Sequence, residues 1–309
     1  MVVVSEEMRE EMERKFRLKR EFINLTYGND ENQNLDLIVP QKSEVHAIIY
    51  IHGGAYLSGT KAQYPSFLLD YAKDNIFATI DYRIISDEND IQMKDILSDI
   101  HDALTKITEY AGAHNAAIKD IILIGHSAGG HIALLYSYKY FQKNEKINIA
   151  ACISLSGPAD FTDDSGWSSM PTWGADITSR LSFLSYLGSR LTGQAIELTQ
   201  FRWTKQEDYP SFEKSITIIS PVAYVEKTGI VPPTLLVHSK DDDQVPYSNA
   251  ERLIAALDNT SVPHKLITAT GSANNHMLGG LVFSDVDPVN FGKQLWSEEV
   301  KKWIETYLE

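Results

Sequence analysis

The sequence predicts an α/β fold with a mostly parallel central sheet and helices on both faces. Short apolar runs rich in β-branched residues alternate with amphipathic helical patterns along most of the 309 residues. Strands that alternate with helices form parallel sheets, because each helix carries the chain back to the start of the next strand. The chain is also 43% hydrophobic, which is enough to bury a sizeable core.

The first expected element is a helix over 6–19, where Met8, Met12 and Phe16 form a four-spaced stripe after Ser5. Two short strands are expected next, near 21–27 and 34–39. The alternating strands that follow are expected at 47–51, 77–82, 120–125, 149–155, 234–239 and 264–269. The helices between and after them are expected at 62–74, 91–110, 128–142, 247–257 and 291–307.

Residues 158–219 interrupt this alternation as a long insertion between two core strands. The insertion holds three of the five tryptophans, and its apolar spacing around 177–187 predicts a short amphipathic helix. We expect one domain over 1–309, with 158–219 as a helical cap over the site and the helix of 1–20 contributing to it. The alternative is a peripheral helical pair that packs its own aromatic residues.

Composition restricts the classes of partner. The chain carries 28 Lys and Arg against 42 Asp and Glu, a net charge of −14, which opposes binding to nucleic acid or to an anionic membrane. Its single cysteine, Cys152, excludes an internal disulfide. No apolar run has the length of a membrane span, which is about 18 residues. We expect a cytoplasmic protein without a membrane span, and we leave a homodimer open.

A candidate nucleophile lies in Gly125-His126-Ser127-Ala128-Gly129. The pentapeptide follows the apolar run 121–124 and precedes a helical pattern, so Ser127 is expected at a sharp turn between a strand and a helix. Flanking glycines permit such a turn, and the turn exposes the hydroxyl to a general base. The pentapeptide alone is a weak signal, and its strand–turn–helix context makes it a strong one.

Candidates for the base and the acid follow the nucleophile in sequence. His276 lies in a Gly- and Asn-rich loop after the last core strand, whereas His264 begins that strand and is expected to be structural. The strand 234–239 is followed by three adjacent aspartates, Asp241, Asp242 and Asp243. Any one of the three could accept the imidazole N–H. The order Ser, Asp, His is that of a serine hydrolase triad.

Several motifs together resemble a known family. They are His52-Gly53-Gly54-Ala55, Asp81-Tyr82-Arg83, Gly125-His126-Ser127-Ala128-Gly129-Gly130-His131 and Ser220-Pro221. In this order and spacing they resemble the α/β-hydrolase esterases, and within them the hormone-sensitive-lipase-like and acetyl-esterase group, from about residue 33 to the C-terminus. The resemblance implies an α/β-hydrolase fold.

The resemblance also implies roles for site residues. It places the oxyanion hole at the N–H groups of Gly54, Ala55 and Ala128, and the acid three positions before Val245, at Asp242. Many relatives have a third glycine where this chain has Ala55, so an N–H orientation that needs positive φ would be strained there. His52 is expected to anchor its loop rather than act as a base.

Other polar residues receive structural interpretations. Arg83 is expected to fix loops, and His131 to pack below the turn of Ser127. His101, His114 and His238 show no partner pattern. The sequence has none of the motifs His-Glu-x-x-His, Cys-x-x-Cys, Gly-x-Gly-x-x-Gly or the phosphate loop, so we expect no metal, nucleotide or other cofactor.

These observations predict a carboxylesterase- or lipase-like serine hydrolase with the triad Ser127, Asp242 and His276. It would cleave small esters of short acyl chains, acetyl to butyryl, through an acyl-enzyme. The resemblance also covers enzymes that deacetylate carbohydrates and arylformamidases, which are alternatives on the same triad. A further alternative is a non-catalytic binding protein, because the fold alone does not establish catalysis.

Overall fold

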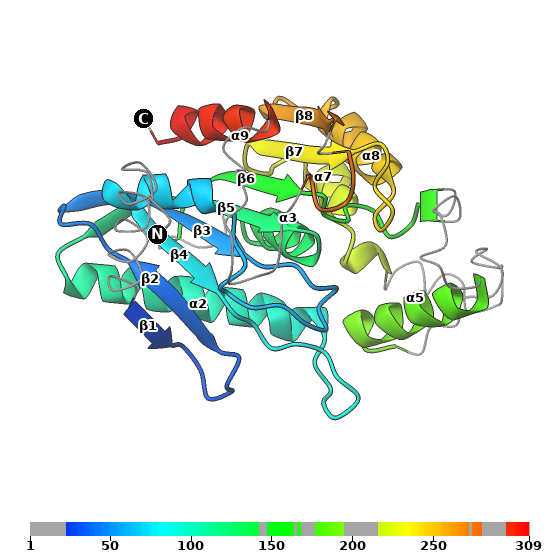
Figure 1. The fold of residues 1–309 in the computed structure, drawn as a ribbon, viewed down its shortest axis with the longest axis horizontal. Coiled ribbons are helices and arrows are strands. Elements are labelled where there is room, and N and C mark those ends of the chain that lie inside the picture. The colour runs from blue at the N-terminus through cyan, green and yellow to red at the C-terminus, as the bar shows by residue number, and fades with distance from the viewer. Residues whose placement is uncertain are drawn as a thin grey trace, which may run out of the picture.

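A mixed sheet forms the centre of the computed structural model, which describes residues 23–141, 147–163, 166–167, 177–194, 216–271, 274–279 and 295–308 (Figure 1). Within these residues the sheet has eight strands in the order β1-β2-β4-β3-β5-β6-β7-β8. The strands are β1 (Ile23–Thr26), β2 (Asn34–Ile38), β3 (Glu44–Ile51), β4 (Ile76–Ile80), β5 (Ala117–His126), β6 (Ile149–Leu155), β7 (Thr234–Ser239) and β8 (His264–Ala269). The six strands β4-β3-β5-β6-β7-β8 are parallel to one another. Strand β2 pairs antiparallel with both β1 and β4. The predicted α/β-hydrolase fold is confirmed.

Helices cover both faces of the sheet. One face packs against α2 (Met93–Ala113), α3 (Ala128–Tyr140), α7 (Pro221–Thr228) and α8 (Tyr247–Leu257), whose apolar side chains share one buried cluster. The other face packs against a 3₁₀ helix, η1 (Ser66–Lys73), and α9 (Leu295–Thr306), which share a second cluster. The central strands β3, β4, β6 and β7 are buried on both sides over most of their length, which explains why they are continuous apolar runs rather than alternating ones.

Two expected elements differ from the structure. The helix expected over 62–74 is wrong in type and length, because only the 3₁₀ helix η1 forms there, after Pro65. A proline disfavours the helical conformation of the residue before it, so no helix can run through this point from 62. The helix α7 was not predicted, although it begins with Pro221 and ends at Gly229 in a left-handed conformation, which are ordinary helix boundary signals.

The insertion is described in part and contains the expected helix, α5 (Ile177–Thr192). Figure 1 shows α5 beyond the carboxyl ends of the central strands. Leu187 and Leu191 of α5 are buried in the cluster that includes α2 and α3. The Arg190 guanidinium donates to the carbonyl oxygens of Ser86 and Asn89. These contacts hold α5 against the loop that precedes α2, and its function as a cap stays a prediction.

The first residues of the insertion, 158–163, lie beside residues 216–222, at and just after its end. The Val222 N–H donates to the Ala159 carbonyl at 3.1 Å, and the Phe161 N–H donates to Ser220 Oγ at 3.0 Å. The expected helix of 6–19 lies outside the described residues. Among the described helices, none is long and apolar enough to cross a membrane.

Candidate active site

Ser127 lies at the turn between β5 and α3, as the sequence predicts. Its backbone has φ 52° and ψ −121°, a conformation that side-chain-bearing residues rarely adopt. The turn depends on close backbone contacts, because a Cβ on Gly125 would lie 2.1 Å from the Gly129 carbonyl oxygen, and one on Gly129 would lie 2.1 Å from that of Ile51. These approaches leave no room for a side chain at either glycine, and they present the Ser127 side chain at the carboxyl edge of the sheet.

His276 reaches this serine from the loop after β8. Its Nε2 lies 3.0 Å from Ser127 Oγ, and its Nδ1 lies 2.9 Å from both carboxylate oxygens of Asp242. A carboxylate only accepts hydrogen bonds, so Nδ1 carries the proton and Nε2 is free to accept from the hydroxyl. His276 is 3% exposed. The structure thus brings the three predicted residues into one hydrogen-bonded chain.

Asp242 follows β7 and is held by four donors. Its Oδ1 accepts from the N–H groups of Gln244 and Val245, both at 2.8 Å, while His238 Nε2 lies 3.2 Å from Oδ2. His276 is the fourth donor. Burial alone would raise the pKa of the Asp242 carboxyl, but hydrogen bonds from His238 and His276 outweigh it and hold this pKa well below its ordinary value.

The two neighbouring aspartates are engaged differently. Asp241 accepts a hydrogen bond from the Asn274 side-chain amide, and the side chain of Asp243 is exposed. Of the three candidates that the sequence left open, Asp242 is therefore the one that contacts His276.

The predicted oxyanion loop follows β3 and packs against Ser127. A Cβ on Gly53 would come within 3.1 Å of the Ser127 Cβ. Gly54, Ala55 and Tyr56 have positive φ angles of 115°, 53° and 66°. Such a conformation costs a residue with a side chain about 1–2 kcal/mol, so the strain expected at Ala55 is present. The loop nonetheless keeps this shape.

The backbone donors of the oxyanion loop are available. Among the described residues, the N–H groups of Gly54, Ala55 and Ala128 donate to no protein acceptor. Ala128 is the first residue of α3, and the first N–H groups of a helix have no partner within the helix. Free N–H groups beside the half-buried Ser127 hydroxyl form an anion-binding arrangement.

Two buried histidines that the sequence analysis did not assign to the site support the acid and the base. His238, for which no partner pattern was seen, contacts both Asp242 and the Val245 carbonyl, the latter at 3.1 Å. His126 Nε2 donates to the His276 carbonyl at 3.1 Å. Burial, and secondarily the neighbouring His276, lowers the pKa of His126 to about 3, so its ring is neutral. His126 and His276 are 150 residues apart, a contact that no local pattern reveals, whereas His238 lies only four residues before Asp242.

His52, Arg83 and His131, which are expected to be structural, stack, pair or hydrogen-bond with neighbouring residues of the fold. The His52 ring stacks on Tyr82 with centroids 4.4 Å apart, and burial lowers the pKa of His52 to about 4. Arg83 makes a bidentate pair with the fully buried Asp99, with the closest atoms 2.7 Å apart. His131 packs below Ser127 as expected, between Tyr56 and the Ile219 carbonyl. These contacts anchor the loops around the site.

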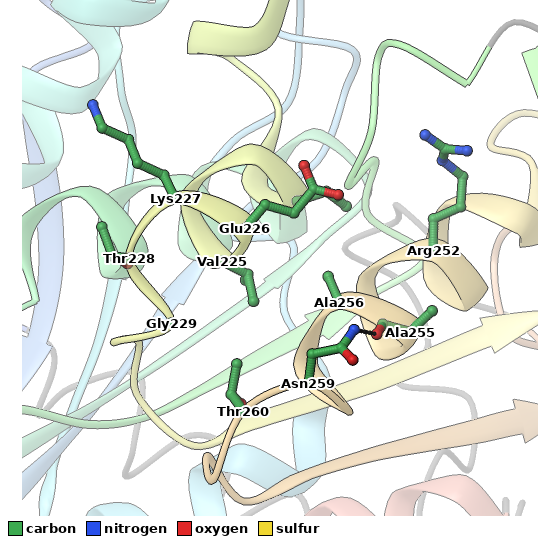
Figure 2. A pocket seen from close by; sticks show the side chains of 11 residues that line it. Val225, Glu226, Lys227, Thr228, Gly229, Arg252, Ala255, Ala256, Asn259 and Thr260 are labelled. Atoms are coloured by element: carbon green, nitrogen blue, oxygen red, sulfur yellow. Dashed lines mark hydrogen bonds between the residues drawn. The ribbon is translucent and has the colours of Figure 1, made fainter.

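A separate groove of about 670 Å³ lies between α7 and α8 (Figure 2). It is lined by residues near the C-terminal ends of both helices, including Thr228 and Asn259. Figure 2 shows the Asn259 amide, just after the end of α8, turned to the Ala255 carbonyl of that helix, to which it donates at 2.8 Å. None of the predicted site residues lines this groove, so it is distinct from the candidate active site.

Comparisons with known proteins find relatives described as methylesterases and as a kynurenine formamidase. The chain is 26% identical over 285 residues to a probable isoprenylcysteine alpha-carbonyl methylesterase from Oryza sativa subsp. japonica, covering 89% of this chain and 61% of that protein. It is 26% identical over 159 residues to a kynurenine formamidase from Salmo salar, covering 50% of this chain and 51% of that one. The chain spans 55% to 61% of the length of the methylesterase relatives from rice and Arabidopsis thaliana that it matches over most of its own length.

Solved structures share the fold. Esterase B from Lactobacillus Rhamnosis (HN001) superposes with a TM-score of 0.65 at 17% identity, covering 97% of this chain and 90% of that one. The family model described as BD-FAE matches residues 35–257, which include the predicted oxyanion loop, Ser127 and Asp242. The chain therefore belongs to the BD-FAE family of α/β-hydrolases.

Proposed function

We propose that this protein is a serine hydrolase that cleaves carboxylic esters through an acyl-enzyme. The observation that carries the proposal is the hydrogen-bonded chain from Ser127 Oγ to His276 Nε2, at 3.0 Å, and from His276 Nδ1 to Asp242, at 2.9 Å. A nucleophile, a base and an acid in contact in this order are the arrangement that activates a serine hydroxyl.

In the acylation step, Ser127 Oγ attacks the ester carbonyl while His276 Nε2 takes its proton. Asp242 stabilises the resulting imidazolium through the Nδ1–H bond. The negative charge that develops on the carbonyl oxygen is stabilised by the N–H groups of Gly54, Ala55 and Ala128. The tetrahedral intermediate then collapses, the bond to the alcohol oxygen breaks, and His276 returns the proton to the departing alcohol.

Deacylation repeats these steps with water as the nucleophile. His276 Nε2 takes a proton from water, the hydroxide attacks the acyl carbonyl, and the same N–H groups hold the second oxyanion. Collapse breaks the bond to Ser127 Oγ, which recovers its proton from His276. The products are a carboxylic acid and an alcohol, and the enzyme returns to its starting state.

For the substrate we propose small esters with acetyl to butyryl chains. The position of α5 beyond the carboxyl ends of the strands supports an insertion that confines the site. Phe161 and Trp167 add aromatic surface near the helix that bears Ser127, since Phe161 stacks on Trp167 at 5.8 Å and packs edge-on against His131 at 5.1 Å. In this proposal residues 158–219 form the cap of a single domain.

The acyl preference has a direct test. Initial rates on p-nitrophenyl acetate, butyrate, octanoate and dodecanoate are expected to fall steeply beyond butyrate. The rice relative is described as a methylesterase, in which the small group of the ester is the alcohol. A methyl ester of a long acyl chain therefore belongs in the same panel. Preference for that ester or for the dodecanoate would overturn the short-acyl proposal while leaving the esterase proposal intact.

A formamidase is the second candidate function, because the chain matches a kynurenine formamidase over half its length. The same triad could attack a formyl carbonyl and release an aromatic amine in place of an alcohol. Comparison of kcat/KM for N-formylkynurenine and p-nitrophenyl acetate separates the two. We expect the ester to be cleaved faster, and a formamide preference of more than about tenfold, or 1.4 kcal/mol, would reverse the assignment.

The experiment that tests the chemistry is covalent labelling with a fluorophosphonate, followed by peptide mass spectrometry. Labelling requires an activated serine, so we expect the phosphonate on Ser127 and no labelling of the Ser127→Ala variant. Absence of labelling in the wild type would favour a binding protein on this fold. Cleavage of acetylated carbohydrate, a cytoplasmic location, a homodimer and the absence of a nucleic-acid partner stay predictions from the sequence.

A further inference from the structure

The predicted oxyanion loop has a strained backbone at Ala55 and Tyr56, and few backbone hydrogen bonds hold it in place. Ala55 and Tyr56 are consecutive non-glycine residues with positive φ. Within the loop, the N–H groups of Leu57 and Ser58 donate to the Gly54 carbonyl, and the Ile85 N–H donates to the Tyr56 carbonyl at 2.8 Å. Strained backbone persists only where surrounding contacts hold it. The buried side chain of Tyr56 supplies a further contact that can hold this loop.

The Tyr56 side chain is buried against the helix that carries the nucleophile. It is 2% exposed, and its hydroxyl lies 2.7 Å from Nδ1 of His131. His131 is fully buried, four residues beyond Ser127 on α3. The two rings also meet edge to face, with centroids 5.8 Å apart. The residue that follows Ala55 is therefore tied to the element that presents Ser127.

The direction of this hydrogen bond follows from the other ring nitrogen. His131 Nε2 lies 2.7 Å from the Ile219 carbonyl oxygen, which can only accept, so Nε2 carries the proton. Nδ1 is then the acceptor, and the Tyr56 hydroxyl donates to it. Burial lowers the pKa of His131 to about 4, so the ring keeps this acceptor at neutral pH. The chain of bonds runs from Tyr56 through His131 to the last residue of the insertion.

We propose that Tyr56 and His131 are positioning residues, which aim the Ala55 N–H at the oxyanion through the hydrogen bond between the Tyr56 hydroxyl and His131 Nδ1. The inference rests on the proposed esterase function. The pair touches neither substrate nor reacting atoms. Its effect is expected in the transition state, where the oxyanion carries its charge, and not in ground-state binding.

The test compares Tyr56→Phe with Tyr138→Phe. Tyr138 is a matched control, because it is 4% exposed, belongs to α3 and contacts Thr234 Oγ1 through its hydroxyl at 2.9 Å, away from the predicted site residues. Both variants lose one buried hydrogen bond and should lose similar thermal stability. We expect Tyr56→Phe to lower kcat on p-nitrophenyl acetate by about 10- to 100-fold with KM within about threefold, because small misplacement of a catalytic group is costly. Tyr138→Phe should keep the wild-type kcat.

A trifluoromethyl ketone inhibitor supplies a readout that a purely structural role would not change. Its carbonyl adds to Ser127 and places an oxyanion in the hole, so its Ki should rise in Tyr56→Phe by the factor by which kcat/KM falls. Equal kcat and Ki in Tyr56→Phe and the wild type, with Ser127 labelled by fluorophosphonate in both, would refute this inference alone. A wild type that resists labelling would refute the proposed function and this inference with it.

Two substitutions of His131 separate its contacts. Asparagine keeps an amide near the position of Nδ1 and can still accept from Tyr56, whereas glutamine reaches toward Ile219 and withdraws the acceptor. We expect His131→Asn to retain kcat within about fivefold, because it keeps the hydrogen bond to Tyr56 in the oxyanion loop. His131→Gln keeps only the contact with Ile219 and should resemble Tyr56→Phe. The reverse order would overturn the proposed anchor, and this comparison stands even if Tyr56→Phe fails to fold.

Discussion

Replacement of Asp242 by asparagine changes one oxygen to an amide group and should disable His276. Oδ1 of Asp242 accepts from two backbone N–H groups, those of Gln244 and Val245, at 2.8 Å. Only an oxygen can satisfy these donors, so the asparagine carbonyl must take this position. Its NH₂ group then occupies the position of Oδ2, where it faces His238 and His276.

The consequence is a change of tautomer. His276 Nδ1 lies 2.9 Å from both oxygens, but Oδ1 already accepts from two backbone N–H groups. The NH₂ group at the Oδ2 position donates, so it favours the tautomer in which Nδ1 accepts and the ring proton lies on Nε2. The nitrogen that faces Ser127 Oγ at 3.0 Å is then protonated and cannot take the hydroxyl proton. The same change in a well-studied serine protease triad lowers kcat about 10⁴-fold. We expect a similar loss here, equivalent to about 5.5 kcal/mol of transition-state stabilisation.

The assay is kcat and kcat/KM on p-nitrophenyl acetate at neutral pH, with Asp243→Asn as the matched control. Asp243 is next in sequence, undergoes the same chemical change and has an exposed side chain. We expect its kcat to stay within about twofold of the wild type, because a surface substitution away from the site changes little. Circular dichroism establishes that both variants are folded. A folded Asp242→Asn variant that keeps a tenth or more of the wild-type kcat would refute the proposed role of Asp242.

Three further predictions concern the frame of the site. Ala55→Gly should raise the free energy of unfolding in urea by about 1 kcal/mol, because glycine relieves the strain at φ 53°; an unchanged midpoint would mean that no strain is stored there. Arg83→Ala should lower the free energy of unfolding by about 3 kcal/mol, since the fully buried Asp99 loses its charged partner. Lys119→Ala, which breaks the exposed pair with Glu44, should lower it by less than about 1 kcal/mol. The histidines whose pKa is lowered to about 3 or 4 bind a proton in the unfolded chain below about pH 6.5 but not in the native one. The free energy of unfolding should therefore fall as the pH is lowered from about 6.5 to 4, by up to 1.4 kcal/mol per pH unit per histidine. His131→Asn should reduce that slope by about 1.4 kcal/mol per pH unit, the contribution of one proton. An equal slope in the variant and the wild type would contradict the assignment of His131 as a neutral buried histidine.

The sheet could be predicted from the sequence because its central strands are buried on both faces. These central strands are continuous apolar runs, and the boundaries expected at 149–155 and 234–239 coincide with those of β6 and β7. The edge strand β8 is mostly half-buried, and it also has the expected boundaries, 264–269. The segment 62–74 was less predictable, since its apolar residues suit either a helix or a 3₁₀ turn and Pro65 decides between them. The sequence signals of α7 are clear, but the segment is only eight residues long.

The candidate site could be predicted only in part, because its sequence signals are local motifs and the order of residues rather than apolar runs. Ser127 and His276 stand out by their local context and their order in the chain, whereas three adjacent aspartates are equivalent until the fold turns one of them to the base. The contacts of His131 with Tyr56 and of His126 with the His276 carbonyl join separate elements. Hydrophobic periodicity places elements relative to the core, and it carries no information about which polar side chains meet across them.

The measurement that tests the central claim most directly is hydrolysis of p-nitrophenyl acetate by the purified protein beside its Ser127→Ala variant. The proposed mechanism predicts turnover in the wild type and a loss on the order of 10⁴- to 10⁶-fold in the variant, because the acyl-enzyme cannot form. Equal turnover in both proteins, or none in either, would contradict the account, since the hydrogen-bonded chain of Ser127, His276 and Asp242 would then not be a working triad.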